Sequence, residues 1–220
     1  MKSVEAASLA GFYPILVERQ ELTVVDAAEA ILEGGARILQ FRYKAFFSRP
    51  IFEHMQRIAE MCRIANALFV VNDRADMAML LGAAVHLGQD DLPPAAARSI
   101  MPPGAIIGFS THNEQQLRDA DREAVDYLAV GPIFGTSSKE NPDATVGVEE
   151  LRRLRPLTKK PVVAIGGITR ANARSVFEAG GDMVAVISDL YPEPCTKATL
   201  RERTEEWLQL CKRGPLLASP

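Results

Sequence analysis

The chain has 220 residues, of which 47% are hydrophobic and 24% are charged, and its formal charge at neutral pH is −3. This composition is typical of a globular protein with enough apolar residues to bury a sizeable core. A slightly acidic chain lacks the basic field that attracts nucleic acids, so we expect no nucleic-acid partner.

Eight apolar runs of strand length recur along the chain, with segments of helical period between them. The expected strands span residues 12–17, 37–41, 67–71, 84–87, 105–109, 127–130, 161–165 and 183–187. Eight βα units in a chain of this length predict an α/β fold, a single (β/α)₈ TIM barrel rather than an open doubly wound sheet. We place the barrel at residues 12–212, between an N-terminal extension (1–11) and a flexible C-terminal tail (213–220).

Several helix ends are predicted from capping residues. Ser48 is expected to open the second helix and Asp73 to cap the third. Thr111 and Glu114 have capping-box spacing at the fifth helix. Gly82 is expected to close the third helix in the left-handed conformation.

Polar residues and glycines follow seven of the apolar runs. These clusters begin at Gln40, Asn72, His86, Ser110, Gly131, Gly166 and Ile187. Because the carboxyl ends of parallel barrel strands meet on one face, we expect the clusters to build one shared site. Their cations, separated carboxylates, hydroxyls and glycine turn suit a phosphorylated substrate and a divalent metal.

The segment after the second strand carries two cations. Side chains alternate along a strand, so Gln40, Arg42 and Lys44 point one way. Phe41 and Tyr43 point the other way. If the shared direction of the first set is the barrel interior, a polyanion can bind there. The alternative is an exposed strand of alternating polarity, although the middle of a parallel barrel strand has no solvated face.

Asp73 and Asp91 follow consecutive strands and are expected to be neighbours at the barrel mouth. Two carboxylates together with substrate phosphate oxygens are the usual ligands of Mg²⁺. Alternatively, Asp73 only caps the next helix and Asp91 only starts a turn. Asp90 is a rival for Asp91, since adjacent carboxylates cannot both point inward.

A long polar loop follows the sixth strand, beginning with residues 131–139. Its hydroxyls and lysine suit a phosphate lid, with a disordered polar loop as the competing account. Gly166-Gly167 and Ile187-Ser188 follow the last two strands, where barrels of this type build a phosphate site from backbone amides.

The histidines and cysteines are expected to be structural. His86 lies in an apolar strand and is predicted to be buried and hydrogen-bonded, His112 to position its neighbours, and His54 to be solvated. The three cysteines are odd in number and lack CxxC spacing, so we expect reduced thiols in a cytoplasmic protein. No uncharged run approaches the roughly 20 residues of a membrane helix, so we expect no membrane association.

Residues 12–190 contain seven motifs, in this order: Gln40-x-Arg42-x-Lys44, Val71-Asn72-Asp73-Arg74, Val85-His86-Leu87-Gly88-Gln89-Asp90-Asp91, Gly108-x-Ser110-Thr111-His112, Gly131-Pro132-Ile133-Phe134-x-Thr136, Ala164-Ile165-Gly166-Gly167-Ile168 and Val186-Ile187-Ser188. This ordered set resembles the motifs of the thiamine phosphate synthase family. The resemblance implies condensation of 4-amino-2-methyl-5-hydroxymethylpyrimidine diphosphate with 4-methyl-5-(2-phosphoethyl)thiazole. The products are thiamine phosphate and pyrophosphate, formed through a pyrimidine carbocation.

The resemblance also implies roles for individual residues. Mg²⁺ would be held by Asp73 and Asp91, and catalysis would come from stabilisation of the leaving group. The residues implied in catalysis are Arg42, Lys44, Ser110 and Lys139. Those implied in substrate binding are Gln40, Phe41, Arg42, Tyr43, Lys44, Asn72, Ser110, Thr136, Ser137, Ser138, Lys139, Gly167, Ile187 and Ser188. A homodimer is expected from the fold alone.

Three positions depart from the family pattern. Tyr43 stands where glutamate is common, Gly135 where proline is frequent, and residues 17–19 lack the usual small polar pair. We expect little effect from Tyr43, because strand alternation turns it away from the site, and a looser lid with slower turnover from Gly135.

Two other functions compete with this interpretation. One is a thiazole tautomerase on the same barrel, which needs neither a metal nor a diphosphate pocket. The other is a non-catalytic thiamine phosphate-binding protein or partner subunit.

Overall fold

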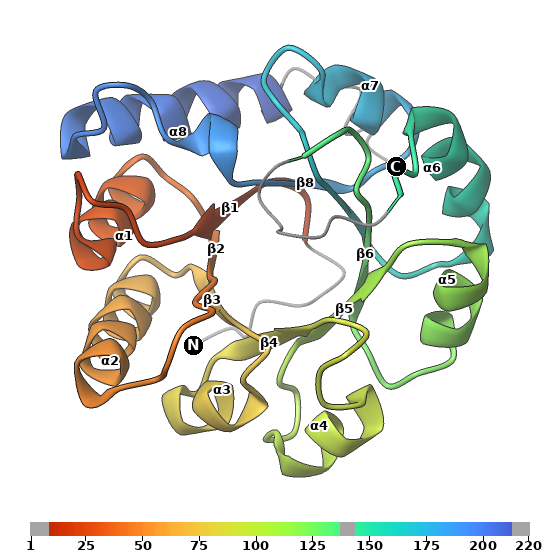
Figure 1. The fold of residues 1–220 in the computed structure, drawn as a ribbon, viewed down its shortest axis with the longest axis horizontal. Helices are drawn as coiled ribbons and strands as arrows, with labels where there is room; N and C mark the ends of the chain where they lie inside the picture. The colour runs from red at the N-terminus through yellow and green to blue at the C-terminus, as the bar shows by residue number, and fades with distance from the viewer. Residues whose placement is uncertain (1–8, 137–143, 213–220) are drawn as a thin grey trace.

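The computed structural model describes residues 9–136 and 144–212, and in these ranges eight parallel strands close into a barrel surrounded by helices (Figure 1). The strands are β1 (Gly11–Leu16), β2 (Ile38–Phe41), β3 (Leu68–Asn72), β4 (Ala84–Leu87), β5 (Ile107–Thr111), β6 (Tyr127–Val130), β7 (Val162–Ile165) and β8 (Met183–Val186). Each strand pairs with its neighbours in sequence, and β8 pairs with β1. The predicted TIM barrel is therefore confirmed.

The helices follow the strands in strict alternation. They are α1 (Val24–Glu33), α2 (Arg49–Ile64), α3 (Ala75–Leu81), α4 (Pro94–Ile100), α5 (Glu114–Asp121), α6 (Val148–Leu154), α7 (Ala173–Glu178) and α8 (Lys197–Lys212), with short 3₁₀ helices η2 (Arg155–Leu157) and η3 (Ser188–Leu190). Within residues 9–136 and 144–212, every helix is too short or too polar to cross a membrane. The expected extension (1–11) and tail (213–220) lie mostly outside the described residues.

Two of the predicted helix caps are wrong. Thr111 is the last residue of β5, where its hydroxyl donates to the Ala129 carbonyl, and Asn113 instead caps α5. Asp73 precedes α3, whose N-cap is Arg74. Gly82 closes α3 in the left-handed conformation, as predicted. Sequence spacing does not predict the true caps of α5 and α3, because strand pairing places Thr111 in the sheet and a turn separates Asp73 from the start of α3.

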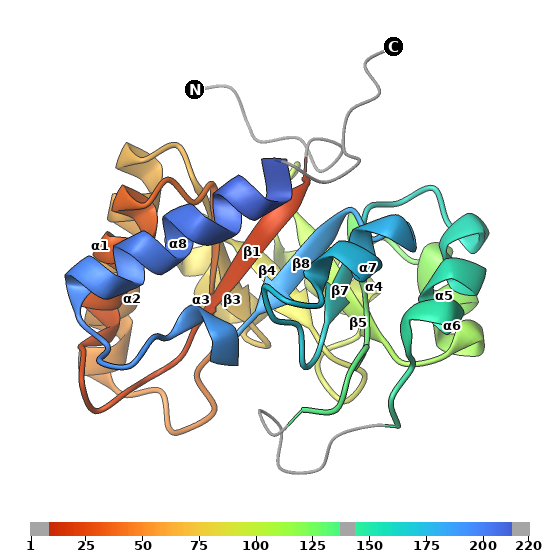
Figure 2. The same cartoon turned by 90° about the horizontal axis from the view of Figure 1, so that it is seen from above.

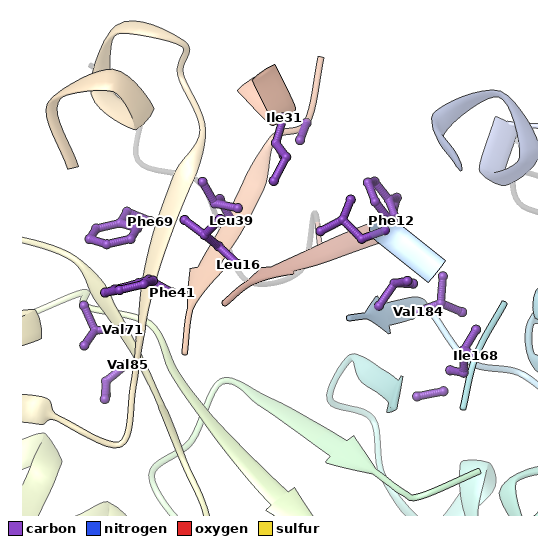
Figure 3. Packing of buried hydrophobic residues seen from close by; sticks show 14 of the residues in the cluster. Phe12, Leu16, Ile31, Leu39, Phe41, Phe69, Val71, Val85, Ile168 and Val184 are labelled. Carbon is purple, nitrogen blue, oxygen red and sulfur yellow. The ribbon is translucent and has the colours of Figure 1, made fainter. Parts of the chain in front are cut away.

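Strand alternation divides the core into two layers. Phe12, Leu16, Leu39 and Phe41 lie on the outer side of the barrel, among the residues that pack between strands and helices (Figure 3). Tyr13, which follows Phe12 on β1, belongs to the separate cluster that fills the barrel interior.

The C-terminal helix, α8, supports the closure of the barrel. α8 runs beside α1 across β1 (Figure 2). Its Trp207 is fully buried and stacks on Phe12 of β1, with ring centroids 5.3 Å apart and planes 5° apart. Burying two aromatic rings contributes about 1.5–3 kcal/mol each, so this contact helps to hold β1 in place where the barrel closes against β8.

Candidate active site

A cavity of about 500 Å³ opens at the carboxyl ends of the barrel strands. Its floor is formed by interior side chains such as Tyr13, Val163 and Ala185. Its rim carries residues at or just after the carboxyl ends of β2 to β8, including Arg42, Lys44, Asn72, Asp73, Asp91, Ser110, His112, Thr136, Gly167, Ile187 and Ser188. The polar clusters therefore border one shared cavity, as expected.

The segment after β2 divides as alternation predicts. Gln40, Arg42 and Lys44 line the cavity, and Gln40 is only 3% exposed. An exposed surface strand, the alternative for this segment, is thus wrong. The side chains of Phe41 and Tyr43 lie on the outer side and do not line the cavity, so their assignment to substrate binding is not supported by side-chain position.

Tyr43 instead holds this segment from outside. Its ring stacks on Phe41 at 6.0 Å and meets the edge of Phe47 at 5.3 Å. The guanidinium of Arg74 lies 4.5 Å above the Phe47 ring. Aromatic and cation–π contacts of this kind stabilise a loop by about 0.5–1.5 kcal/mol each. Tyr43, which stands where the family commonly has glutamate, therefore helps to stabilise the cationic segment.

The two cations of this segment have different surroundings. The Lys44 ammonium donates to Oδ2 of Asp73 in an ion pair. Among the described residues, no carboxylate pairs with the guanidinium of Arg42, although it lines the cavity. Arg42 therefore offers an uncompensated positive charge to an anionic ligand.

Asp73 has the conformation and the surroundings of a functional residue. Its φ of 65° lies in the left-handed region, which few residues other than glycine adopt and which is often found at active sites. Burial raises the pKa of its carboxyl from 3.8 to about 6; the Lys44 ammonium opposes this rise and the neighbouring Asp91 carboxylate adds to it. A bound cation would relieve the repulsion between these two neighbouring carboxylates.

The partner of Asp73 is Asp91 rather than Asp90. Oδ2 of Asp91 accepts a hydrogen bond of 2.7 Å from the Gly88 backbone, which fixes its orientation. Asp90 is exposed. Two hard oxygen donors plus ligand phosphate oxygens match Mg²⁺, which keeps several waters and seldom binds in an all-protein cage. The residues present therefore fit this metal.

Asn72 offers an unused hydrogen-bond donor to a ligand in the cavity. The residue is 6% exposed and lines the cavity. Its Nδ2 is buried and has no acceptor among the described residues. An unsatisfied buried donor costs about 1–3 kcal/mol, so an acceptor on a bound ligand would relieve it.

The opposite rim is built by glycines. Gly166 and Gly167 have φ of 99° and 61°. Their strand end pairs with the loop after β6, since the Phe134 amide donates to the Gly166 carbonyl at 3.0 Å. A Cβ on Gly166 would lie 2.4 Å from Cβ of Pro132. Only glycine fits this close approach.

Other residues assigned to the second phosphate site lie near these glycines. Thr136, Ile187 and Ser188 line the cavity, and Ser188 begins η3. Ser137, Ser138 and Lys139 lie outside the described residues.

The histidines are partly as expected. His86 is buried and bonded through both ring nitrogens, and burial lowers its pKa from 6.5 to about 4. Nδ1 of His112 lies 2.6 Å from the Gly131 carbonyl oxygen, which positions the end of β6. The expectation for His54 is wrong, since the residue is half-buried and its Nδ1 is enclosed without a hydrogen-bond partner among the described residues.

A hydrogen-bonded chain on the cavity floor was not foreseen. Gln40 Nε2 donates to the Tyr13 hydroxyl at 2.8 Å. The Tyr13 hydroxyl oxygen in turn lies 3.0 Å from the Tyr127 hydroxyl oxygen. The Tyr127 hydroxyl lies 3.0 Å from His86 Nδ1, and His86 Nε2 lies 2.9 Å from Ser110 Oγ. A tyrosine hydroxyl inside a barrel needs a polar partner, and that requirement was the available signal in the sequence.

Comparisons with known proteins agree on one family. The family model described as thiamine monophosphate synthase matches residues 12–190. The chain is 47% identical over 189 residues to a thiamine-phosphate synthase of Koribacter versatilis, with 86% of each chain covered. It is 41% identical over 198 residues to that of Chlorobium phaeovibrioides, which covers 88% of this chain and 95% of the relative. The solved structure of thiamine phosphate pyrophosphorylase from Pyrococcus furiosus has a TM-score of 0.81 at 34% identity, with 92% of this chain and 96% of that chain covered.

Proposed function

The chain belongs to the thiamine monophosphate synthase family and forms thiamine phosphate in thiamine biosynthesis, and from this we propose which residues bind the substrates and promote the reaction. The pyrimidine diphosphate occupies the side of the cavity lined by Gln40, Arg42, Lys44, Asn72 and Ser110. The thiazole phosphate occupies the opposite side. The observation that carries this proposal is that the cations, the two carboxylates and the glycine turn share one cavity.

The first half-site is suited to a leaving diphosphate. Arg42 has no carboxylate partner among the described residues, and Lys44 can exchange part of its contact with Asp73 for a phosphate oxygen. Asn72 can donate its unused Nδ2 hydrogens to the same group. Donors fixed in advance around a developing negative charge lower the barrier without reorganising during the reaction. In this proposal, Lys139 adds a further positive charge.

Mg²⁺ belongs to the proposal through Asp73 and Asp91. When bound, it would neutralise charge on the diphosphate as the bond to carbon breaks. The chain's own contribution is to hold both carboxylates at the mouth, Asp91 through the Gly88 amide and Asp73 through its left-handed backbone.

The second half-site is suited to a small phosphate monoester. Gly166 and Gly167 bring the backbone to the cavity without side chains, and Ser188 begins a helical turn beside them. Backbone amides and hydroxyls in such an arrangement bind phosphate without a charged side chain. We assign Thr136, Ser137, Ser138, Gly167, Ile187 and Ser188 to the thiazole phosphate. Holding both substrates in one cavity supplies the proximity that a condensation needs.

The competing functions are less well supported. A thiazole tautomerase would have no use for Arg42, the Lys44–Asp73 pair or the orphaned Asn72 amide. A protein that only binds thiamine phosphate would have no use for a metal site at the diphosphate. The named relatives are thiamine-phosphate synthases, which supports the catalytic alternative.

The assembly and location are proposals of lesser weight. We propose that residues 12–212 act as one catalytic domain in the cytoplasm and that the chain forms a homodimer. Exposed Met79 and Leu80 on α3 and Ile100 on the adjacent α4 supply an apolar surface for it. Light scattering of the wild type and a Leu80→Glu variant tests the dimer, and a monomeric wild type contradicts it.

The experiment for the substrate assignment uses the purified protein, Mg²⁺ and both substrates. Thiamine phosphate is measured as fluorescent thiochrome after oxidation. Arg42→Ala and Lys44→Ala should each lower kcat/KM for the pyrimidine diphosphate by about 100-fold or more, whereas KM for the thiazole phosphate changes little. Arg118→Ala removes an exposed arginine paired with Glu114 on α5 and serves as the control. Unchanged kinetics in both cavity variants would overturn the assignment.

A further inference from the structure

The turn after β7 is held by a side chain that would ordinarily cap a helix. Asn172 is the N-cap of α7, and in the described part of the chain its side chain makes no capping hydrogen bond. Its Oδ1 instead accepts from the Thr169 amide at 2.8 Å, and its Nδ2 donates to the Gly167 carbonyl at 3.0 Å. An N-cap asparagine usually accepts from the second or third amide of its helix. The Asn172 side chain therefore fixes the turn of residues 167–169, both ends of which line the cavity.

An ion pair joins this turn to the segment after β8. Oδ2 of Asp189 accepts from Nε of Arg170 at 3.0 Å and lies 3.4 Å from the Arg170 backbone nitrogen. Arg170 directly follows Thr169, and Asp189 directly follows Ser188. Thr169 and Ser188 both line the cavity. Each member of the pair is therefore adjacent in sequence to a residue that faces the ligand space.

Helix α8 holds the same pair from the other side. Nη1 of Arg170 donates to Glu206, and Nη1 of Arg203 donates to the Asp189 carbonyl at 2.8 Å. Nε of Arg203 donates to Oε2 of Glu206 at 3.1 Å, which closes a ring of four residues. The side chains of Asp189 and Arg203 are only 18% exposed, so salt screens their contacts less than those of surface pairs. Because α8 packs on β1 and α1, the ring ties both segments to a fixed part of the barrel.

The charges of this ring favour a role in position rather than in attraction. Its two cations and two carboxylates add no net charge beside the half-site that we assign to the thiazole phosphate. The Asp189 carboxylate by itself is unfavourable there, because like charges repel. Attraction of a phosphate therefore gives no reason for Asp189. Its contact with Arg170 gives one, since that contact fixes two cavity-lining segments relative to each other.

We propose that Asn172, Arg170 and Asp189 are positioning residues for the thiazole phosphate. Asn172 sets the shape of the turn after β7, and the Arg170–Asp189 pair sets the distance between that turn and Ser188. Polar groups that are held in place before binding lose less conformational freedom when the phosphate arrives, which raises affinity. This inference rests on the proposed function, in which the thiazole phosphate occupies this side of the cavity.

The test measures KM for each substrate in Asn172→Ala and Asp189→Ala. Each variant removes hydrogen bonds that order a binding segment, so KM for the thiazole phosphate should rise about tenfold. KM for the pyrimidine diphosphate and kcat should change less than about twofold, because the other half-site and the reacting groups are untouched. Two variants on different segments are used so that poor folding of one leaves the other as a test.

The Asp189 variants separate position from electrostatics by the sign of the effect. Removal of a negative charge beside a phosphate site would by itself lower KM for the thiazole phosphate. Loss of the contact with Arg170 raises it. Asp189→Asn loses the charge but keeps an oxygen that can accept from Arg170, so its KM should stay within about threefold of wild type. Recovery in Asp189→Asn together with a rise in Asp189→Ala supports the positioning role.

Two control variants separate position from stability. Thr23→Ala removes the side-chain cap of α1, so it should lower the melting temperature without changing either KM. Arg174→Ala removes an exposed arginine that pairs with Glu178 on α7, and it should leave both the melting temperature and the kinetics as in wild type.

The outcomes separate this inference from the proposed function. Calorimetry with the thiazole phosphate alone measures its affinity even where no product forms. A wild type that binds it but makes no thiamine phosphate contradicts the function, and weaker binding in the folded variants then still supports the positioning. A wild type that does not bind it contradicts both. Normal wild-type turnover with an unchanged or lowered KM for the thiazole phosphate in folded Asn172→Ala or Asp189→Ala, or with an equal rise in both KM values, overturns the positioning.

Discussion

Lys44 and Asp73 pair at the mouth of the barrel, from the ends of two adjacent strands. The pair joins the cationic segment after β2 to the carboxylate that we assign to Mg²⁺. A ligand that carries both phosphate and metal would therefore engage the two partners together. This relationship makes the carboxylates the most informative positions for mutation.

Asp73→Asn and Asp91→Asn should each reduce Mg²⁺-dependent turnover by about 100-fold or more, because the amide retains the shape but loses the charge. Asparagine also tolerates the left-handed conformation of residue 73. The free energy of unfolding should therefore stay within about 1 kcal/mol of wild type in urea titrations. Asp76→Asn, which removes the exposed partner of Arg74, should keep turnover within about twofold and serves as the control. Full activity in both cavity variants would show that the metal assignment is wrong.

Gly166→Ala should destabilise the protein by about 2–4 kcal/mol, because it combines a left-handed backbone with a clash against Pro132. The displaced rim should also raise KM for the thiazole phosphate. Gly104→Ala is a matched control, since Gly104 has a φ of 80° but open space at its Cβ position. It should cost only about 1 kcal/mol. Equal losses in thermal unfolding would mean that the close approach at Gly166 is unimportant.

Tyr43→Ala should cost about 1–2 kcal/mol through the lost contacts with Phe41 and Phe47. Because Tyr43 supports the segment from outside the cavity, KM for the pyrimidine diphosphate should rise several-fold while kcat changes less than about twofold. Tyr43→Phe, which retains the ring, should behave as wild type. A large loss of kcat in Tyr43→Ala would place this side chain in the chemistry.

His86 should make stability depend on pH. Burial holds its pKa at about 4 in the folded protein, whereas the unfolded value is 6.5. Below pH 6.5 the unfolded chain takes up a proton that the folded chain does not, so stability is lost as pH falls toward 4. The loss from this group amounts to about 3 kcal/mol. Urea titrations of wild type and His86→Gln between pH 4 and 7 should diverge by up to this amount, and parallel curves would contradict the shift.

The hypothesis about Gly135 stays a prediction. A Cβ at this position meets nothing within 4 Å, so the described structure gives no steric reason for glycine there. Kinetics of Gly135→Pro that match the wild type would remove the proposed link between this residue and the lid.

The barrel and the location of its site could be predicted because both depend on local patterns. Each βα unit carries its own apolar run and helical period, and the topology then brings every strand end to one face. Gln40, Arg42 and Lys44 were placed correctly by alternation alone. The same rule turned Phe41 and Tyr43 outward, although sequence resemblance had grouped them with the substrate residues.

The features that were missed depend on register between strands. Thr111 resembled a helix cap until its pairing with β6 placed it in the sheet. The left-handed backbone of Asp73 follows from a turn that spacing does not encode. The contact between Tyr13 and Tyr127 joins residues 114 positions apart, and it requires Gly108 opposite Tyr127. No local pattern specifies such a meeting.

The most direct test of the central claim is the stoichiometry of products. Purified wild-type protein is supplied with Mg²⁺ and both substrates, and thiamine phosphate and pyrophosphate are measured in the same reaction, with and without EDTA. The account predicts equal amounts of both products and loss of both when EDTA is present. Folded protein that forms neither product with Mg²⁺ present, or that forms both at the same rate in EDTA, would contradict it.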